Sequence, residues 1–387
     1  MMNIRNTISK IENNRYLNWK VIILLYLITR ISIVLLLNYG AWNDASMLCY
    51  ASDCKQHWRN AQFVVDGINP YLVWKGIEGS PNLHLVLRAD HPPFMYILLP
   101  SLVWIWRSVW AMLLLYFIFD FINLYLISNI SKFKKIPALL YISAPSFFRG
   151  LIFAEDEIMC VAFALASIYF LRKNRYSLST IMLALSFNLK FFPIILFPAL
   201  LLSMSIFKKF EPGILPKKIN YSRLVKQVGI FVLITAFFHS FFYPHWDIYY
   251  QYRAFHYTLA SAGFGIWSIL PIGYYPLVLT SAFILFYLFS YIKNLDIKTT
   301  YLLGSLIFIS TYPRFSVDHL IFLIPLFLIW TRLNLMDTLL WIFLSITVIL
   351  DFLALPTIGI FNQNYATYLL ILVLLGFYLI ILNRLRK

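Results

Sequence analysis

The fold is decided by a long polar stretch between two apolar parts of the chain. It runs from Tyr39 to Pro93 and reads YGAWNDASMLCYASDCKQHWRNAQFVVDGINPYLVWKGIEGSPNLHLVLRADHPP. A connection of roughly fifty residues without a long apolar run is unusual in a compact protein, and such connections are usually functional or disordered. Large aromatic side chains argue against disorder here: Trp42, Trp58, Tyr71 and Trp74. The sequence therefore predicts a folded loop that carries chemistry.

The rest of the chain is strongly apolar. Hydrophobic residues make up 61% and charged residues 12% of the 387 residues, and the mean hydropathy is +0.75. Runs such as Val21–Leu37, Val109–Ile127 and Tyr365–Leu382 reach or approach the length that crosses the hydrocarbon core of a bilayer. We therefore expect an all-α polytopic membrane protein, with residues 1–387 forming a single transmembrane domain.

The net charge of +16 is concentrated in the linkers between apolar runs. Basic linkers at 132–135, 172–175, 208–226, 293–298 and 384–387 can all be placed on the side of the N-terminus, and the positive-inside rule makes that side cytoplasmic. Acidic residues and most histidines collect on the other side. This distribution explains the charge without nucleic acid. It predicts an extracytoplasmic functional face, in the cell membrane or in an ER-like membrane of a eukaryotic cell.

The predicted order is a cytoplasmic tail (1–19), a first span (20–38), a first outer loop (39–107) and eleven further spans. The outer loop is expected to hold interfacial amphipathic helices, among them a membrane-dipping helix over 91–106, since a full crossing there would invert the sides of the basic linkers. A basic cytoplasmic loop (207–225) and an outer loop (244–273) lie between later spans. Those spans are expected at 108–129, 136–152, 158–172, 178–190, 191–206, 226–243, 274–292, 299–312, 319–332, 336–355 and 364–383. Several are short for a bilayer, which predicts broken helices beside a water-filled cavity.

Acidic residues mark two points in the first loop. Asp53 opens an aromatic-rich stretch that ends before Gly67, and the sequence predicts an amphipathic helix from Asp53 to Asp66. Asp53 is then either a helix cap, a common role for Asp, or a group held at the membrane–water boundary for chemistry. The run Asp90-His91-Pro92-Pro93 predicts a helix start. Asp90 could cap it, and His91 could meet a phosphate.

Ionisable residues also stand between later apolar runs. Glu155-Asp156-Glu157 repel one another unless they are bound to a cation or a polyhydroxyl ligand, or form a solvated outer turn. Lys190 is a lone cation between two apolar runs, which makes it a functional candidate. Cations on the outer side indicate an anionic ligand, with interfacial snorkelling as the alternative for each: Arg253, His256 and Arg314, the last followed by Asp318 and His319.

Other signals narrow the class of protein. Cys49 and Cys54 on the outer loop either form a disulfide or stay free thiols, and without a second pair they are a weak metal signal. The sequence contains no Walker loop, zinc motif or Gly-rich nucleotide fingerprint. We expect no cofactor, with a divalent metal left open.

Taken in order, these motifs resemble the GT-C glycosyltransferases, multispan enzymes that use a polyprenyl-phosphate sugar, and most of all the polyprenol-phosphate-mannose-dependent mannosyltransferases. The resemblance covers roughly residues 20–332. It is carried by Asp53, Gly67-Ile68-Asn69-Pro70-Tyr71, His91-Pro92-Pro93-Phe94, Glu155-Asp156-Glu157, Lys190-Phe191-Phe192-Pro193, Arg253 and Asp318-His319-Leu320. Two positions depart from the family pattern: Asp44 stands apart from Asp53, where the family often has a neighbouring acid, and Asp318 replaces the first His of a late pair.

The resemblance implies a GT-C-like bundle of about twelve transmembrane helices and a hexosyltransferase. It would move a hexose, with mannose favoured, from a polyprenyl-phosphate donor to a glycan or lipid acceptor, with inversion. The implied roles are a general base (Asp53), its assistant (His319), donor-phosphate contacts (Lys190, Arg253, Arg314, His91, His256) and acceptor contacts (Asp156, Glu155, Tyr71). Its partners would be this donor, this acceptor and membrane lipids.

The main alternative is a secondary transporter, or a flippase of a lipid-linked or anionic substrate. A transporter predicts internal repeats and polar residues at the middle of the membrane. The sequence shows no repeat, and its polar residues gather on one side.

Overall fold

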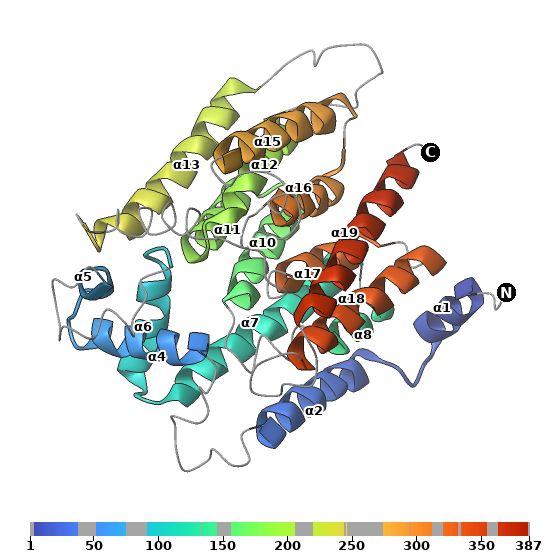
Figure 1. Ribbon diagram of the computed structural model, residues 1–387, viewed down its shortest axis with the longest axis horizontal. Coiled ribbons are helices and arrows are strands. Elements are labelled where there is room, and N and C mark those ends of the chain that lie inside the picture. The colour runs from blue at the N-terminus through green and yellow to red at the C-terminus, as the bar shows by residue number, and fades with distance from the viewer. Residues whose placement is uncertain are drawn as a thin grey trace.

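A computed structural model describes most of the chain, namely residues 4–37, 52–74, 91–132, 134–144, 156–205, 220–243, 245, 274–293, 295–311, 320–331, 334–353 and 363–385. These ranges contain helices and turns but no strand (Figure 1). The all-α class is therefore confirmed for the described part of the chain.

The regular elements in the described ranges are all helices. In chain order they are α1 (Ile4–Asn13), α2 (Trp19–Leu37), α4 (Ser52–Val65), α5 (Pro70–Trp74), α6 (Met95–Ile105), α7 (Val109–Ile130), α8 (Lys135–Ile142), α10 (Glu157–Arg172), α11 (Tyr176–Leu189), the 3-10 helix η2 (Phe192–Leu196), α12 (Phe197–Ser205), α13 (Tyr221–Ser240), α15 (Tyr275–Ile292), α16 (Ile297–Thr311), α17 (Leu320–Trp330), α18 (Leu335–Leu353) and α19 (Gln363–Leu385).

Two described helices, α7 and α13, are long and apolar enough to cross a membrane by length and composition. Others are apolar but shorter, among them α6, α11 and α17. The predicted spans 158–172 and 178–190 appear as α10 and α11, and the predicted interfacial stretch 91–106 contains the 11-residue helix α6. A membrane protein fits these helices, while the number of twelve spans stays a prediction.

Helix α10 forms the centre of the bundle (Figure 1). It packs against α7, α11 and α17, and most of its side chains are buried. A helix that is apolar on all sides needs such burial. Small residues let α11 approach closely, and Ser167 of α10 lies 3.2 Å from Ser179 of α11, oxygen to oxygen.

A buried ion pair joins α2, α7 and α8. Arg30 Nε donates to Asp120 Oδ2 at 2.8 Å, and neither side chain is exposed. The remaining guanidinium nitrogens donate to the carbonyls of Ile142 (2.7 Å) and Tyr141 (3.4 Å). These are last-turn carbonyls of α8, which lack partners within their own helix. Of the predicted span 136–152 the structure describes residues 136–144, and within them α8 ends at Ile142, where Arg30 binds the end of the helix.

Removing one member of this pair should destabilise the bundle more than removing both. Asp120→Leu leaves a buried guanidinium without its counterion, and we expect a loss of about 3–5 kcal/mol in the free energy of unfolding. The double variant Arg30→Leu/Asp120→Leu should recover part of this loss. The melting temperature of the purified protein in detergent measures both. Equal losses in the two variants would show that the helix-end bonds of Arg30, rather than its charge, hold the three helices together.

Candidate active site

The start of α10 carries two buried carboxylates. Asp156 is the N-cap residue and Glu157 the first residue of the helix, and they are 2% and 1% exposed. A helix N-terminus favours negative charge. Two neighbouring carboxylates nevertheless repel each other, and a buried charge without a partner is costly. Their burial therefore requires a nearby cation.

Lys190 supplies this cation from the break between α11 and η2. Its backbone is extended, with φ −146° and ψ 136°, and Pro193 is the second residue of η2 just beyond it. The Nζ atom donates to Asp156 Oδ1 at 2.8 Å and also to Glu157 Oε1. The solvated outer turn considered for these acids is therefore wrong for Asp156 and Glu157, which are buried and bound to a cation.

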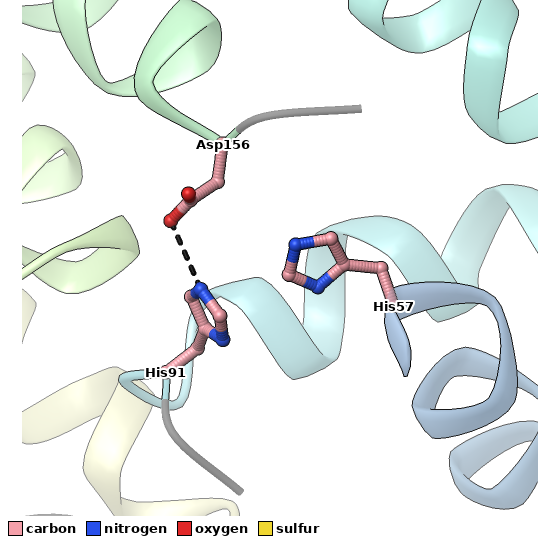
Figure 2. A group of neighbouring side chains, drawn as sticks. All are labelled: His57, His91 and Asp156. Atoms are coloured by element: carbon pink, nitrogen blue, oxygen red, sulfur yellow. Dashed lines mark ion pairs between the residues drawn. The ribbon is translucent and has the colours of Figure 1, made fainter. Parts of the chain in front are cut away.

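His91 connects the first loop to the same carboxylate. Its Nε2 lies 3.1 Å from Asp156 Oδ2 (Figure 2). The ring of His57, from α4, meets the His91 ring edge-on, with 4.7 Å between centroids and 70° between planes. Figure 2 shows both rings beside the carboxylate. His57 of α4, His91 just before α6 and Asp156 at the start of α10 thus lie together.

Two tyrosines fix the position of His91. The Tyr71 hydroxyl donates to the carbonyl of His91 at 2.8 Å, and the backbone N–H of His91 donates to the Tyr96 hydroxyl at 3.4 Å. The two tyrosine rings pack edge-on at 5.3 Å, and Phe242 from the end of α13 packs against both. The Pro70-Tyr71 and His91-Pro92-Pro93 motifs, which are separate in sequence, therefore form one structure.

Helix α4 matches the predicted amphipathic helix closely, since it runs over Ser52–Val65 instead of Asp53–Asp66. It ends because Gly67 has a left-handed backbone, with φ +81°. The N–H groups of Gly67 and Ile68 donate to the carbonyls of Val64 and Phe63, the pattern of a Schellman cap. Position 53 lies in the first turn of α4, one helical turn before His57 and on the same face.

The charges around Asp156 set its protonation. Burial on its own raises the pKa of the Asp156 carboxyl, but the charges of Lys190 and His91, with the hydrogen bond from His91, hold this pKa well below its usual range. Because the folded-state pKa is lowered, the pair stabilises the fold above the ordinary Asp pKa. This contribution is lost only when the pH falls through the lowered value.

The same side chains could hold a metal ion. One ligand atom each of His57, His91 and Asp156 lies within 4.8 Å of the others, and all three residues are buried. Two imidazoles and a carboxylate are a ligand set that suits Zn²⁺. The other Asp156 oxygen is already bound by Lys190. The sequence did not predict that these three residues meet, because they are far apart along the chain.

Several predicted site residues lie outside the described residues: Glu155, Arg253, His256, Arg314, His319 and the side chain of Asp53. Of the predicted set, the structure brings together Lys190, His91, Asp156 and Tyr71. The structure adds His57 and Glu157 to this group. A signal for His57 was present in the sequence, because four residues separate it from Asp53 and helical periodicity places both on one face.

Residues 154–261 match the sequence model of a family described as Mannosyltransferase (PIG-M), which is of the GT-C type. This match confirms the resemblance predicted from the motifs. It supports a glycosyltransferase that moves mannose. The matched segment begins just before Asp156 and includes Lys190 and positions 253 and 256. No curated protein matches the chain.

Loss of Lys190 should damage the fold through the buried acids. Lys190→Met leaves two carboxylates buried without their cation, and we expect about 3–5 kcal/mol less stability. Lys173→Met, which removes an exposed lysine at the other end of α10, is the control and should have little effect. The melting temperature in detergent is the measurement.

The triple variant Lys190→Met/Asp156→Asn/Glu157→Gln separates charge from packing. It removes the acids together with the cation and should recover part of the lost stability. If Lys190→Met is as stable as the wild type, the burial of Asp156 and Glu157 does not depend on Lys190.

Proposed function

We propose that the protein is a multi-pass membrane mannosyltransferase. It transfers mannose from a polyprenyl-phosphate donor to a glycan or lipid acceptor on the extracytoplasmic face, with inversion at the anomeric carbon. One observation carries the proposal. The first-loop residues His57 and His91 meet Asp156 and Lys190, which lie inside the segment that matches the mannosyltransferase family. This match favours group transfer over the transporter or flippase alternative.

Asp53 acts as the general base in this proposal. It takes the proton from the acceptor hydroxyl while that oxygen attacks the anomeric carbon and the bond to the donor phosphate breaks. A base in reach of the hydroxyl contributes about 10²–10⁴-fold to such a step. The position of residue 53 supports the role, because the same face of α4 carries His57 to the Asp156 cluster. His319 assists the base or holds the acceptor.

The lipid phosphate leaves with its charge neutralised by cations. Arg253, Arg314 and His256 are the proposed contacts, with His91 and Lys190 at the edge of the site. Fixed cations stabilise a leaving phosphate without further rearrangement. Lys190 has three N–H donors, and two of them bind Asp156 and Glu157. Its proposed contact with the phosphate therefore uses the third.

The acceptor side involves Glu155 in direct contact, with Asp156 and Tyr71 as positioning residues. Asp156 is bound by Lys190 and His91, and the Tyr71 hydroxyl donates to the His91 carbonyl. Both residues therefore hold His91, a proposed donor-phosphate contact, beside the proposed acceptor site. Correct placement of reacting groups is a large part of catalysis in such a displacement.

We also propose that transfer needs no metal, because the lipid phosphate is a fair leaving group once cations neutralise it. The His57–His91–Asp156 group is where a metal-dependent mechanism would place the ion. Activity in the presence of a chelator separates the two mechanisms. An enzyme that uses only a general base keeps its activity when the chelator is added. A metal-dependent enzyme loses its activity and regains it when Zn²⁺ is added.

The sharpest test of the base is Asp53→Asn. Asn caps a helix as well as Asp does, so folding should survive, whereas transfer should fall by about 10²–10⁴-fold because the proton acceptor is lost. Asp66→Asn is the matched control. Asp66 follows the same helix and forms an exposed pair with Arg107 at 3.4 Å. Radiolabel transfer in membranes measures both variants, and near-normal turnover of Asp53→Asn would leave Asp53 as a cap.

The sidedness of the site is tested by cysteine labelling. In a Cys49→Ser/Cys54→Ser background, Ser80→Cys in the first outer loop should react with an impermeant thiol reagent in intact cells. Asn174→Cys, in the basic turn between α10 and α11, should react only after permeabilisation. The reverse pattern would place the proposed active face in the cytoplasm and contradict the proposal.

A further inference from the structure

A second charged site lies at the other end of α10 from the candidate active site. It is a cavity of about 670 Å³ formed where several helices begin or end. Because α10 has 16 residues, its two ends are roughly 24 Å apart.

Basic side chains outnumber acidic ones in the lining of this cavity. Five come from linkers that the sequence predicted to share one side of the membrane: Lys132, Lys134, Arg172, Lys298 and Arg384. Asp296 is the one acidic residue among the described lining residues. Its carboxylate already accepts from the Thr299 hydroxyl at 2.6 Å and from the Lys298 N–H at 3.0 Å. The cavity thus carries an excess of positive charge.

Cations at helix ends often serve the helices themselves, because carbonyl ends attract positive charge. Two of the five do so here, and a third is paired with a carboxylate. Arg172 donates to the carbonyl of Ile130, and Lys298 donates to that of Ile329 at 3.2 Å. Arg384 pairs with Asp337 and lies over the Trp330 ring at 3.9 Å.

Helix capping does not account for Lys132 and Lys134. Both are exposed, and neither side chain has an ion pair with another described residue. Positive charge is crowded around Lys298, in the first turn of α16 and just before the predicted span 299–312. Burial lowers the pKa of Lys298, and Arg172, Lys132 and Lys134 lower it further, against the opposing effect of Asp296. A bound anion would relieve this repulsion.

We propose that this cavity binds the phosphate of an anionic phospholipid headgroup. The cations supply charge-assisted hydrogen bonds to phosphate oxygens, and the apolar lining from Leu328, Ile329 and Ile381 accommodates the adjoining lipid. Basic pockets between membrane helices on the cytoplasmic side bind such headgroups. A soluble phosphate compound offers the same chemistry, and the experiment distinguishes the two sources.

The test is a lipid titration of the full-length, delipidated protein in detergent. The lipid probe is short-chain phosphatidylglycerol, the neutral comparison is short-chain phosphatidylcholine, and inorganic pyrophosphate is the soluble probe. Lys132→Gln/Lys134→Gln should weaken phosphatidylglycerol binding by about thirtyfold, as expected for two cations beside an anionic lipid. The control is Lys173→Gln/Lys293→Gln, which removes two exposed lysines that are close in sequence to Arg172 and Asp296 but do not line the cavity. This control should bind as the wild type does.

The outcomes separate clearly. Loss of phosphatidylglycerol binding in the cavity variant alone, without competition by pyrophosphate, supports a lipid as the source of the phosphate. If the wild type and the control bind pyrophosphate and the cavity variant does not, the cavity is a phosphate site whose ligand is soluble. Equal weakening in cavity and control variants, or equally tight binding of phosphatidylcholine, overturns the proposal. The readout is binding, so it does not depend on the proposed transferase activity.

Discussion

Two carboxylates buried side by side at the start of α10 need a positive charge, and much of the structure follows from that need. Lys190 can reach them because α11 ends at Leu189 and the chain turns into η2. Asp156 uses its second oxygen for His91. The first loop is thereby tied to the centre of the bundle. A pair of short, broken helices is the geometry that allows a lysine to lie between two apolar runs without being exposed to lipid.

The sequence was most informative where local chemistry decides structure. The helix at Ser52–Val65 and its end at Gly67 follow from turn residues and capping, so they could be predicted closely. The break at Lys190 followed from a charge between apolar runs and a nearby proline. These features depend on a few neighbouring residues, and a single sequence contains that information.

Long-range partners were not predictable in the same way. Arg30 and Asp120 were visible as charges within spans, yet nothing local shows that they bind each other or that Arg30 ends α8. A cation for Asp156 and Glu157 was one of three alternatives, beside a polyhydroxyl ligand and a solvated turn, and only the fold identifies it as Lys190. His57 looked like one of several polar loop residues until α4 was placed beside His91. The two ends of α10 carry different charges: buried acids and imidazoles lie at its start, and an excess of cations that includes Lys132 and Lys134 lies at its end.

The central claim is that the chain transfers mannose from a lipid phosphate. Membranes that contain the protein, supplied with radiolabelled polyprenyl-phosphate mannose, test it most directly, with nucleotide-linked mannose as the comparison donor. We predict label in a glycan or lipid acceptor from the polyprenyl-phosphate donor, and none directly from the nucleotide sugar when synthesis of the lipid donor is blocked. Direct use of the nucleotide sugar, or movement of the labelled lipid across the membrane without transfer of its sugar, would contradict the account.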